Sequence, residues 1–184
     1  MQRPSINLDD PETVRLDDQG RSVAYFCRSN PVKVDNDLIS QLKAAAVRLG
    51  GNVRLCLHDG PDAPFHEMIN LEHRSGYYRP HRHRVKGESY HIIEGTMGAF
   101  VFDENGVVQE ANLLEPGNNF LYRIGIDMYH AVMPISDVLI YHESKPGPFI
   151  REGDSIFPDW APDGSDPEIA AAYTEKLRRM LGVL

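Results

Sequence analysis

Four residues in this sequence have the side-chain types and spacing to hold a divalent transition metal. His81 and His83 are two residues apart, Glu88 follows a turn-like stretch at residues 85–87, and His130 lies far downstream. Neutral imidazole with one carboxylate suits iron, manganese, cobalt, nickel, copper or zinc, and these ligand types do not choose among the metals. With five- or six-coordinate metal, three histidines and a glutamate leave room for water or a bidentate substrate.

Strand geometry decides which neighbouring side chains can share this site. Residues i and i+2 point to the same face of a strand, so His81 and His83 point together and Arg82 points away. If the chain turns at residues 85–87, Glu88 begins the returning strand and lies beside the pair. His91 is then on the opposite face from the glutamate, and we interpret it as a structural histidine or as one that supports a metal ligand.

Five further side chains are candidates for contacts with a substrate: Arg79, Tyr90, Tyr122, Arg123 and His142. Tyr90 lies on the predicted inner face and either lines a cavity or fills the core. Arg79 has the parity of the histidine pair, so it offers a planar fork to a carboxylate or phosphate, or it is solvated at the rim. The same alternatives apply to Tyr122 and Arg123. His142 is a proton donor near the metal, a partner of a metal ligand, or an exposed histidine.

The elements that must position these residues are predicted to be short strands. Period-two patterns and apolar runs separated by turn residues predict strands at residues 23–26, 53–57, 65–72, 77–84, 88–93, 97–103, 107–114, 120–124, 130–135 and 138–144. Asn105-Gly106 between two apolar runs predicts a hairpin. Many short strands at close spacing favour an antiparallel sandwich or barrel.

Two helices are predicted to flank the strands. Apolar residues recur at spacings of three and four over residues 36–49, with Asp35 or Asn36 as the cap. A C-terminal helix begins after Asp166 and has an apolar stripe of Ile169, Ala172, Tyr173, Leu177 and Met180. We expect one domain, with an arm at residues 1–20 that holds at most a short edge strand, flanking elements at 21–64, a metal-binding core at 65–145, and a C-terminal loop and helix at 146–184.

Composition limits the kinds of partner. The net charge of −8 argues against a broad surface for nucleic acid or anionic membranes. No stretch approaches the roughly 20 apolar residues of a membrane helix, and no apolar signal region is present, so a cytoplasmic location is expected. Cys27 and Cys56 lie in apolar contexts, which predicts buried, reduced thiols.

Residues 76–95 resemble the first motif of the cupin superfamily. Gly76 is followed by His81-x-His83, then by Glu88 after four residues and by Gly95 after six more. The second motif is matched by residues 117–130, with arginine where the motif has proline and a longer gap before its histidine. The resemblance implies an all-β protein with flanking helices, built on a cupin-type antiparallel β-barrel (double-stranded β-helix or jelly roll). It implies that the ligands of the metal are His81, His83, Glu88 and His130.

More narrowly, the chain resembles the WbuC-like cupin-fold metalloproteins. The residues that support this are RPHRHRVKGESYHIIEG at 79–95, FDENG at 102–106, HESKPGPF at 142–149 and WAPDG at 160–164. These proteins look like companions of surface-polysaccharide biosynthesis in bacteria. The resemblance, together with an arm at residues 1–20 able to pair with a neighbour's sheet edge, predicts a homodimer.

We therefore expect a metal-dependent enzyme, such as an isomerase or epimerase, that acts on a small polar molecule of anionic or sugar-like character. The metal would polarise a substrate oxygen or activate water or dioxygen. One alternative is a metal-dependent dioxygenase, which requires iron, and another is a non-catalytic binding or sensor module. The sequence has no Ser, Cys or Lys nucleophile arrangement and no phosphate-cradling glycine loop, so covalent hydrolysis and nucleotide triphosphate chemistry are disfavoured.

Overall fold

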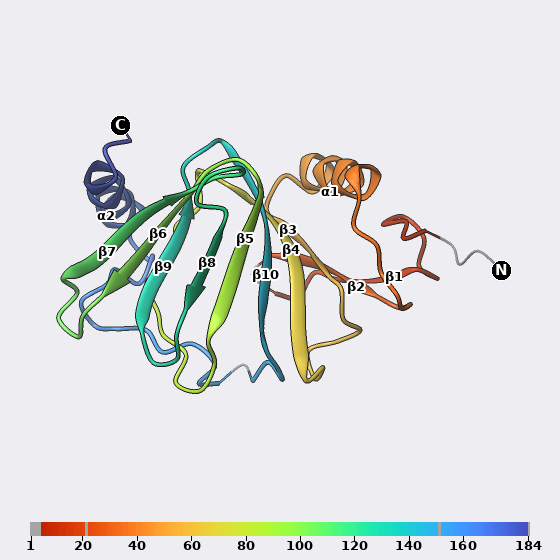
Figure 1. Cartoon of the computed structure of the whole chain (residues 1–184), viewed down its shortest axis with the longest axis horizontal. Coiled ribbons are helices and arrows are strands. Elements are labelled where there is room, and N and C mark those ends of the chain that lie inside the picture. The colour runs from red at the N-terminus through yellow and green to blue at the C-terminus, as the bar shows by residue number, and fades with distance from the viewer. Residues whose placement is uncertain (1–4, 21, 151, 184) are drawn as a thin grey trace.

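A computed structural model describes residues 5–20, 22–150 and 152–183, which form two β-sheets and two α-helices (Figure 1). In chain order the elements are β1 (Val14–Asp17), β2 (Val23–Cys27), α1 (Asn36–Leu49), β3 (Val53–Cys56), β4 (Phe65–His73), β5 (Glu88–Glu94), β6 (Met97–Phe102), β7 (Val108–Leu114), β8 (Leu121–Ile124), β9 (Tyr129–Pro134), β10 (Val138–Pro146) and α2 (Pro167–Met180). One sheet has the strand order β1-β2-β3-β4-β10-β5-β8, and the other has the order β7-β6-β9.

The two sheets pack against each other around a shared apolar core. Tyr90 and Ile92 of β5 contribute from the larger sheet, and Met97 and Ala99 of β6 from the smaller one. The structure confirms the predicted fold class, which is mostly β with antiparallel sheets and two helices. In the described residues the ladders form two separate sheets that pack as a sandwich, and no ladder closes them into the expected barrel.

Helix α1 covers one end of the larger sheet. The Asp35 side chain accepts a hydrogen bond from the Leu38 backbone N–H at 3.1 Å, which caps the helix as predicted. Gly50 ends it with a φ of 68°, a conformation that suits glycine. The buried face, including Leu42, packs into an apolar cluster with β3 and β4. Because α1 connects β2 to β3, these two strands run parallel, an exception to the expected antiparallel pairing.

Helix α2 packs on the outer face of the smaller sheet. The Asp166 side chain accepts hydrogen bonds from the first turn, as predicted. The predicted apolar stripe does not coincide with the buried face of the helix. Two of its residues, Ile169 and Met180, are 56% and 49% exposed. The residues that are buried are Ala170, Thr174 and Leu177. This narrow face is sufficient for packing, because Phe100 and Phe102 of the sheet supply the large apolar side chains of the interface.

The segment before β5 differs from the sequence prediction. Residues 77–84 were predicted to form a strand, and this is wrong: only His81 and Arg82 form single bridges, to His130 and Ile156 respectively. The two bridges lead to different partners, and Pro80 has no N–H to donate, so a continuous ladder cannot form here. The segment is nevertheless held in an extended path.

Several smaller predictions are confirmed. β6 and β7 form the hairpin at Asn105-Gly106, where Gly106 has a φ of +81° and a Cβ would lie 2.6 Å from the Trp160 ring. The N-terminal arm contributes the edge strand β1. Cys27 and Cys56 are free and buried. No helix in the described part of the chain has the length and apolar character needed to span a membrane.

Candidate metal centre

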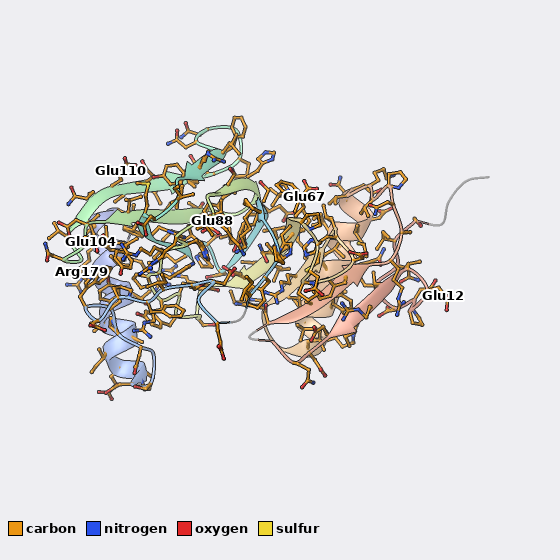
Figure 2. All side chains as sticks on the ribbon, turned by 90° about the horizontal axis from the view of Figure 1, so that it is seen from below. Glu12, Glu67, Glu88, Glu104, Glu110 and Arg179 are labelled. Carbon is orange, nitrogen blue, oxygen red and sulfur yellow. The ribbon has the colours of Figure 1, made fainter. Side chains whose placement is uncertain are left out.

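The four predicted metal ligands come from three separate segments that the fold brings together. His81 and His83 lie in the extended segment before β5, Glu88 is the first residue of β5, and His130 lies in β9. One potential ligand atom from each residue lies within 4.8 Å of the others. His83, Glu88 and His130 are at most 2% exposed, and Figure 2 shows Glu88 within the body of the molecule, whereas Glu12, Glu104 and Glu110 lie toward its edges.

Backbone contacts hold this arrangement. His81 and His130 exchange two backbone hydrogen bonds, of 2.9 and 2.8 Å, which bring their imidazole centroids to 4.6 Å. Gly87 lies against the end of β8, where an added Cβ would be 3.0 Å from the Ile124 carbonyl oxygen. The chain can therefore turn tightly before Glu88. Arg82 faces the other way, as predicted, with its guanidinium 4.3 Å from the Tyr129 ring centroid.

Each of the three imidazoles is oriented by a backbone carbonyl. Nδ1 of His81 lies 3.1 Å from the Arg79 oxygen, and Nδ1 of His130 lies 2.8 Å from the Met128 oxygen. Nδ1 of His83 makes the same kind of contact with the Asp154 oxygen. Because a carbonyl only accepts, the proton lies on Nδ1 and the lone pair on Nε2. This is the tautomer and the outer contact expected of a metal-binding histidine.

The Nε2 atoms converge on the Glu88 carboxylate. Oε2 of Glu88 lies 3.5 Å from Nε2 of His83, and Oε1 lies 2.5 Å from Nε2 of His130. Within the described residues, neither nitrogen forms a hydrogen bond of acceptable geometry, although both are buried. Buried nitrogen lone pairs aimed at a carboxylate need a shared cation, so this donor set fits a divalent transition metal.

The electrostatics also favour a cation at this place. Burial and the neighbouring His130 lower the pKa of His81 to about 3. Burial also opposes charge on His83, but the Glu88 carboxylate outweighs it and raises the pKa of His83. Burial likewise opposes charge on Glu88, but the two histidines and Lys145 hold the pKa of this carboxyl well below its usual value. The glutamate is thus an anion that attracts either a proton on His83 or a metal ion.

A partly buried lysine beside Glu88 was not predicted from the sequence. Nζ of Lys145 lies 3.4 Å from Oε2 of Glu88 and 2.7 Å from Oε1 of Glu143. The Asn70 side chain donates to Oε2 of Glu143 at 3.0 Å. Burial disfavours charge on Lys145, but the two glutamates outweigh it and raise its pKa. Glu143 and Lys145 alternate along β10 and therefore share one face of the strand. His142, the candidate chosen from the sequence, lies on the opposite face.

The loop after β10 closes over the same place. Nζ of Lys86 lies 2.5 Å from the Pro148 oxygen and also pairs with the Asp154 carboxylate. Both charged residues are 8% exposed. A hollow of about 100 Å³ lies between this loop and the segment of His83. No regular pattern in the sequence marks Asp154, because it lies in irregular chain far from the histidines.

Of the five predicted substrate contacts, Tyr90 lies closest to the centre. It is 2% exposed, and its hydroxyl donates to Oε1 of Glu88, so it both fills the core and orients a candidate ligand. Arg79 is directed toward the C-terminal loop, where its guanidinium lies 4.8 Å from the Phe157 ring centroid and 3.4 Å from the Pro158 oxygen.

The other three candidates lie away from the four ligands. The Tyr122 hydroxyl donates to Glu110 at 2.8 Å, and Arg123 is exposed. Nε2 of His142 lies 3.5 Å from Oε1 of Glu67. His142 lies opposite His91 in the pairing of β10 with β5. A substrate role for Arg79, Tyr122, Arg123 and His142 remains a prediction.

Comparison with known proteins finds distant similarities and leaves the reaction open. Residues 34–114 match a family model described as "Domain of unknown function (DUF6016)". A search of curated proteins gave no match. The structural neighbours are cupin-fold proteins, among them the capsular polysaccharide assembling protein CapF from Staphylococcus aureus, with 15% identity over 57% of this chain and 31% of CapF and a TM-score of 0.48.

Two further neighbours have similar scores. Bacillus subtilis oxalate decarboxylase, a protein with Mn(II) centres, has 17% identity over 51% of this chain and 24% of its own, with a TM-score of 0.42. KdgF from Halomonas sp. has 17% identity over 53% of this chain and 82% of its own, with a TM-score of 0.41. The chain thus spans about a third of CapF. The chain has a His/Glu group that could hold a metal ion.

Proposed function

We propose that this chain is a metal-dependent enzyme in which His81, His83, Glu88 and His130 hold one divalent transition metal, and that its substrate is a small anionic or sugar-like molecule. The observation that carries the proposal is the buried convergence of four ligand atoms within 4.8 Å. Each imidazole has its outer nitrogen fixed by a backbone carbonyl. Such a site is organised before any ion arrives, which favours tight binding.

The charges around the site favour an anionic substrate. With neutral imidazoles, Glu88 and Glu143 contribute two negative charges and Lys145 one positive charge, which leaves −1. The adjacent Lys86 and Asp154 cancel each other. A divalent ion brings the cluster to +1. Since an uncompensated buried charge is costly, a ligand with one negative charge is favoured in the loaded site.

The chain's own residues orient and balance the reacting centre. A bound divalent metal supplies Lewis acidity, which polarises a substrate oxygen or lowers the pKa of water. Tyr90 donates to Oε1 of Glu88, and Lys145 places its charge near Oε2. These contacts keep the carboxylate ionised and hold its orientation.

Two alternatives use the same residues differently. A metal-dependent dioxygenase requires iron and consumes oxygen with its substrate. A binding or sensor module holds the ligand tightly without turning it over. A WbuC-like role linked to bacterial surface-polysaccharide biosynthesis, in a cytoplasmic homodimer, is a finer form of the proposal that rests on the sequence resemblance.

The test is a comparison of anion binding with and without metal. Protein purified without chelator is analysed for metal and for any small molecule that co-purifies. Calorimetric titration with small carboxylates and sugar acids is then run on loaded and metal-free protein. We expect the loaded form to have a saturable binding site that the metal-free form lacks. Equal binding by both forms, or none in a fully loaded protein, contradicts the proposal. Oxygen consumption with the bound compound would indicate the dioxygenase. Binding without turnover would indicate the sensor module.

A further inference from the structure

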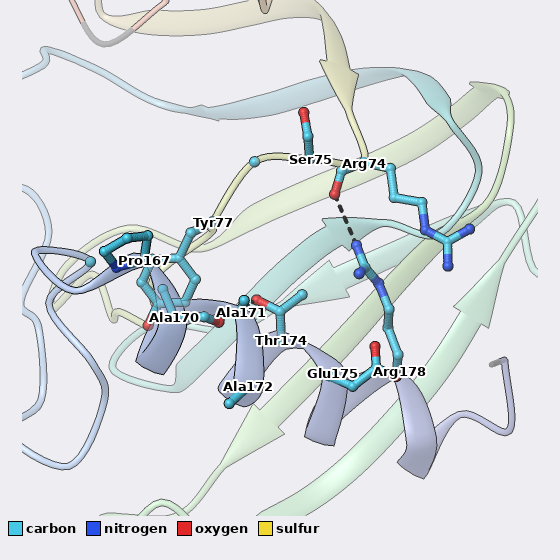
Figure 3. Close-up of a pocket in the computed structure, with 12 residues that line it drawn as sticks. Arg74, Ser75, Tyr77, Pro167, Ala170, Ala171, Ala172, Thr174, Glu175 and Arg178 are labelled. Carbon is cyan, nitrogen blue, oxygen red and sulfur yellow. Dashed lines mark hydrogen bonds between the residues drawn. The ribbon is translucent and has the colours of Figure 1, made fainter.

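A cavity of about 590 Å³ lies between α2 and residues 74–77 (Figure 3). Its lining includes Arg74, Ser75 and Tyr77 on one side and Ala170, Ala171 and Arg178 on the other. A second hollow of about 430 Å³ shares Arg74, Ser75 and Arg178. None of the four candidate metal ligands lines either space, so these cavities are separate from the metal centre.

Two positive side chains, those of Arg74 and Arg178, line both cavities. The Arg178 guanidinium donates to the Arg74 backbone oxygen at 2.9 Å, as Figure 3 shows, so the two residues are held together. Its Nε is buried without a hydrogen-bond partner among the described residues. Burial and the neighbouring Arg74 lower the pKa of Arg178. The charge of Glu175 opposes these effects only in part, so the fold leaves the positive charge of Arg178 incompletely compensated.

The carboxylates nearby do not neutralise this pair. Glu175 lines the same cavity, but its closest cation is Arg179, at 3.9 Å. Asp137 lines the second hollow, and it contacts Arg74 through its backbone oxygen, which accepts from the Arg74 N–H at 3.1 Å. In the described part of the chain, no carboxylate oxygen lies within ion-pair distance of either Arg74 or Arg178. The cavity therefore has two guanidinium groups available to an anion.

We propose that this cavity binds a small molecule bearing a phosphate or carboxylate group. Arg74 and Arg178 contact the anionic group, because planar guanidinium groups pair with such oxyanions through two parallel hydrogen bonds. Ser75 lines the same end of the cavity. Tyr77 and the methyl groups of Ala170 and Ala171 form an apolar wall for the remainder of the molecule. Sites of this size with few polar groups are typical of small ligands.

The cavity is tested by titrating metal-free protein with inorganic phosphate and with citrate at constant ionic strength. We expect saturable binding by the wild type, because the site does not depend on the metal, and the anion that binds more tightly identifies the class. Arg74→Gln and Arg178→Gln are each expected to weaken binding at least about tenfold, since a hydrogen bond to a charged group contributes about 1.5–3 kcal/mol.

Arg179→Gln is the matched control, because it removes the same charge from the neighbouring position of α2, where the side chain is 67% exposed. Its affinity is expected to stay within about twofold of the wild type. The absence of saturable binding, or an equal loss in Arg179→Gln, overturns the proposal. Should Arg178→Gln unfold, Arg74→Gln decides, since the Arg74 guanidinium has no hydrogen-bond partner among the described residues. A failure here leaves the metal proposal untouched.

Discussion

The two halves of the larger sheet, the α1 end (β1 to β4) and the β10 end (β10, β5 and β8), bury different kinds of side chain. Around α1, β3 and β4 the buried cluster is apolar throughout and includes Leu42 and Leu55. Around β10 and β5 the same sheet buries Glu88 and Glu143 and partly buries the Lys145 side chain, which is 16% exposed. Burying charge costs free energy, whereas burying aliphatic side chains supplies it. The contrast agrees with the proposal that the α1 end mainly stabilises the fold and that the β10 end holds the candidate metal site.

The largest loss of stability is expected from Lys145→Met. The substitution leaves Glu88 and Glu143 buried without the cation between them, at an expected cost of about 3–5 kcal/mol in the free energy of unfolding. Urea unfolding of metal-free protein at pH 7 measures it. Lys43→Met is the control, since its pair with Glu94 is 46% exposed on both sides and should contribute less than about 1 kcal/mol. Equal effects of the two substitutions would erase the proposed contrast.

Leu42→Ala should separate stability from metal binding. Leu42 is 1% exposed, so its truncation is expected to lower the free energy of unfolding by about 2–4 kcal/mol while metal content stays unchanged. Unfolding and metal analysis of the same preparation check both parts. Val47→Ala, on the 82% exposed face of α1, should change stability by less than about 0.5 kcal/mol. Loss of metal in folded Leu42→Ala protein would show that the two ends are not independent.

Tyr90→Phe should sharpen the account of the polar end. Loss of the hydroxyl that donates to Glu88 is expected to weaken metal binding about 10–100-fold, because the carboxylate loses the contact that orients it. Competition with a chelator of known affinity measures the change. Tyr122→Phe removes a hydroxyl bound to Glu110, outside the ligand group, and should leave affinity within about twofold. Equal affinity of Tyr90→Phe and wild type would remove Tyr90 from the site.

The smallest predicted effect concerns a stacked histidine pair. Burial and His66 lower the pKa of His58 to about 4, and the two rings lie 4.2 Å apart between centroids. A hydrogen bond with the Glu67 backbone and the charge of Asp59 raise the pKa of His58, and the charge of Arg54 lowers it, all by smaller amounts. A depressed histidine pKa means that the fold favours the neutral ring. This contribution is fully present above about pH 6.5 and is lost as the pH falls toward 4.

Allowing for the partial exposure of His58, we expect its contribution to fall by about 1 kcal/mol between pH 7 and pH 5. Measuring the free energy of unfolding of the wild type and of His58→Gln at the two pH values isolates the contribution of His58. A wild type that loses no more stability than His58→Gln contradicts the prediction.

Local patterns in the sequence were sufficient to predict much of the fold. Asp35 and Asp166 cap the two helices as expected, and Asn105-Gly106 forms the hairpin. The orientation of α2 was not predictable from periodicity, because Ala170 and Thr174 make the contact that larger apolar residues were expected to make. Which face a helix buries depends on the partner surface, and local spacing does not contain that information.

The candidate site was predictable where its residues follow strand parity. His81, His83 and Glu88 converge although residues 77–84 form no strand, because single bridges keep the chain extended. Lys145 and Asp154 reach the site through long-range pairing and a loop path. Such contacts depend on register between distant segments, which residue spacing does not encode.

The most direct test is the metal content of a His81→Ala/His83→Ala variant. The matched control is His91→Ala/His142→Ala, which removes two histidines that pair across β5 and β10, away from the ligand group. After purification without chelator and loading with a divalent metal, the wild type and the control should each hold one ion per chain. The His81→Ala/His83→Ala protein should hold less than about a tenth of that amount, because two of its four ligands are gone. Full metal content in this variant would contradict the assignment of the site.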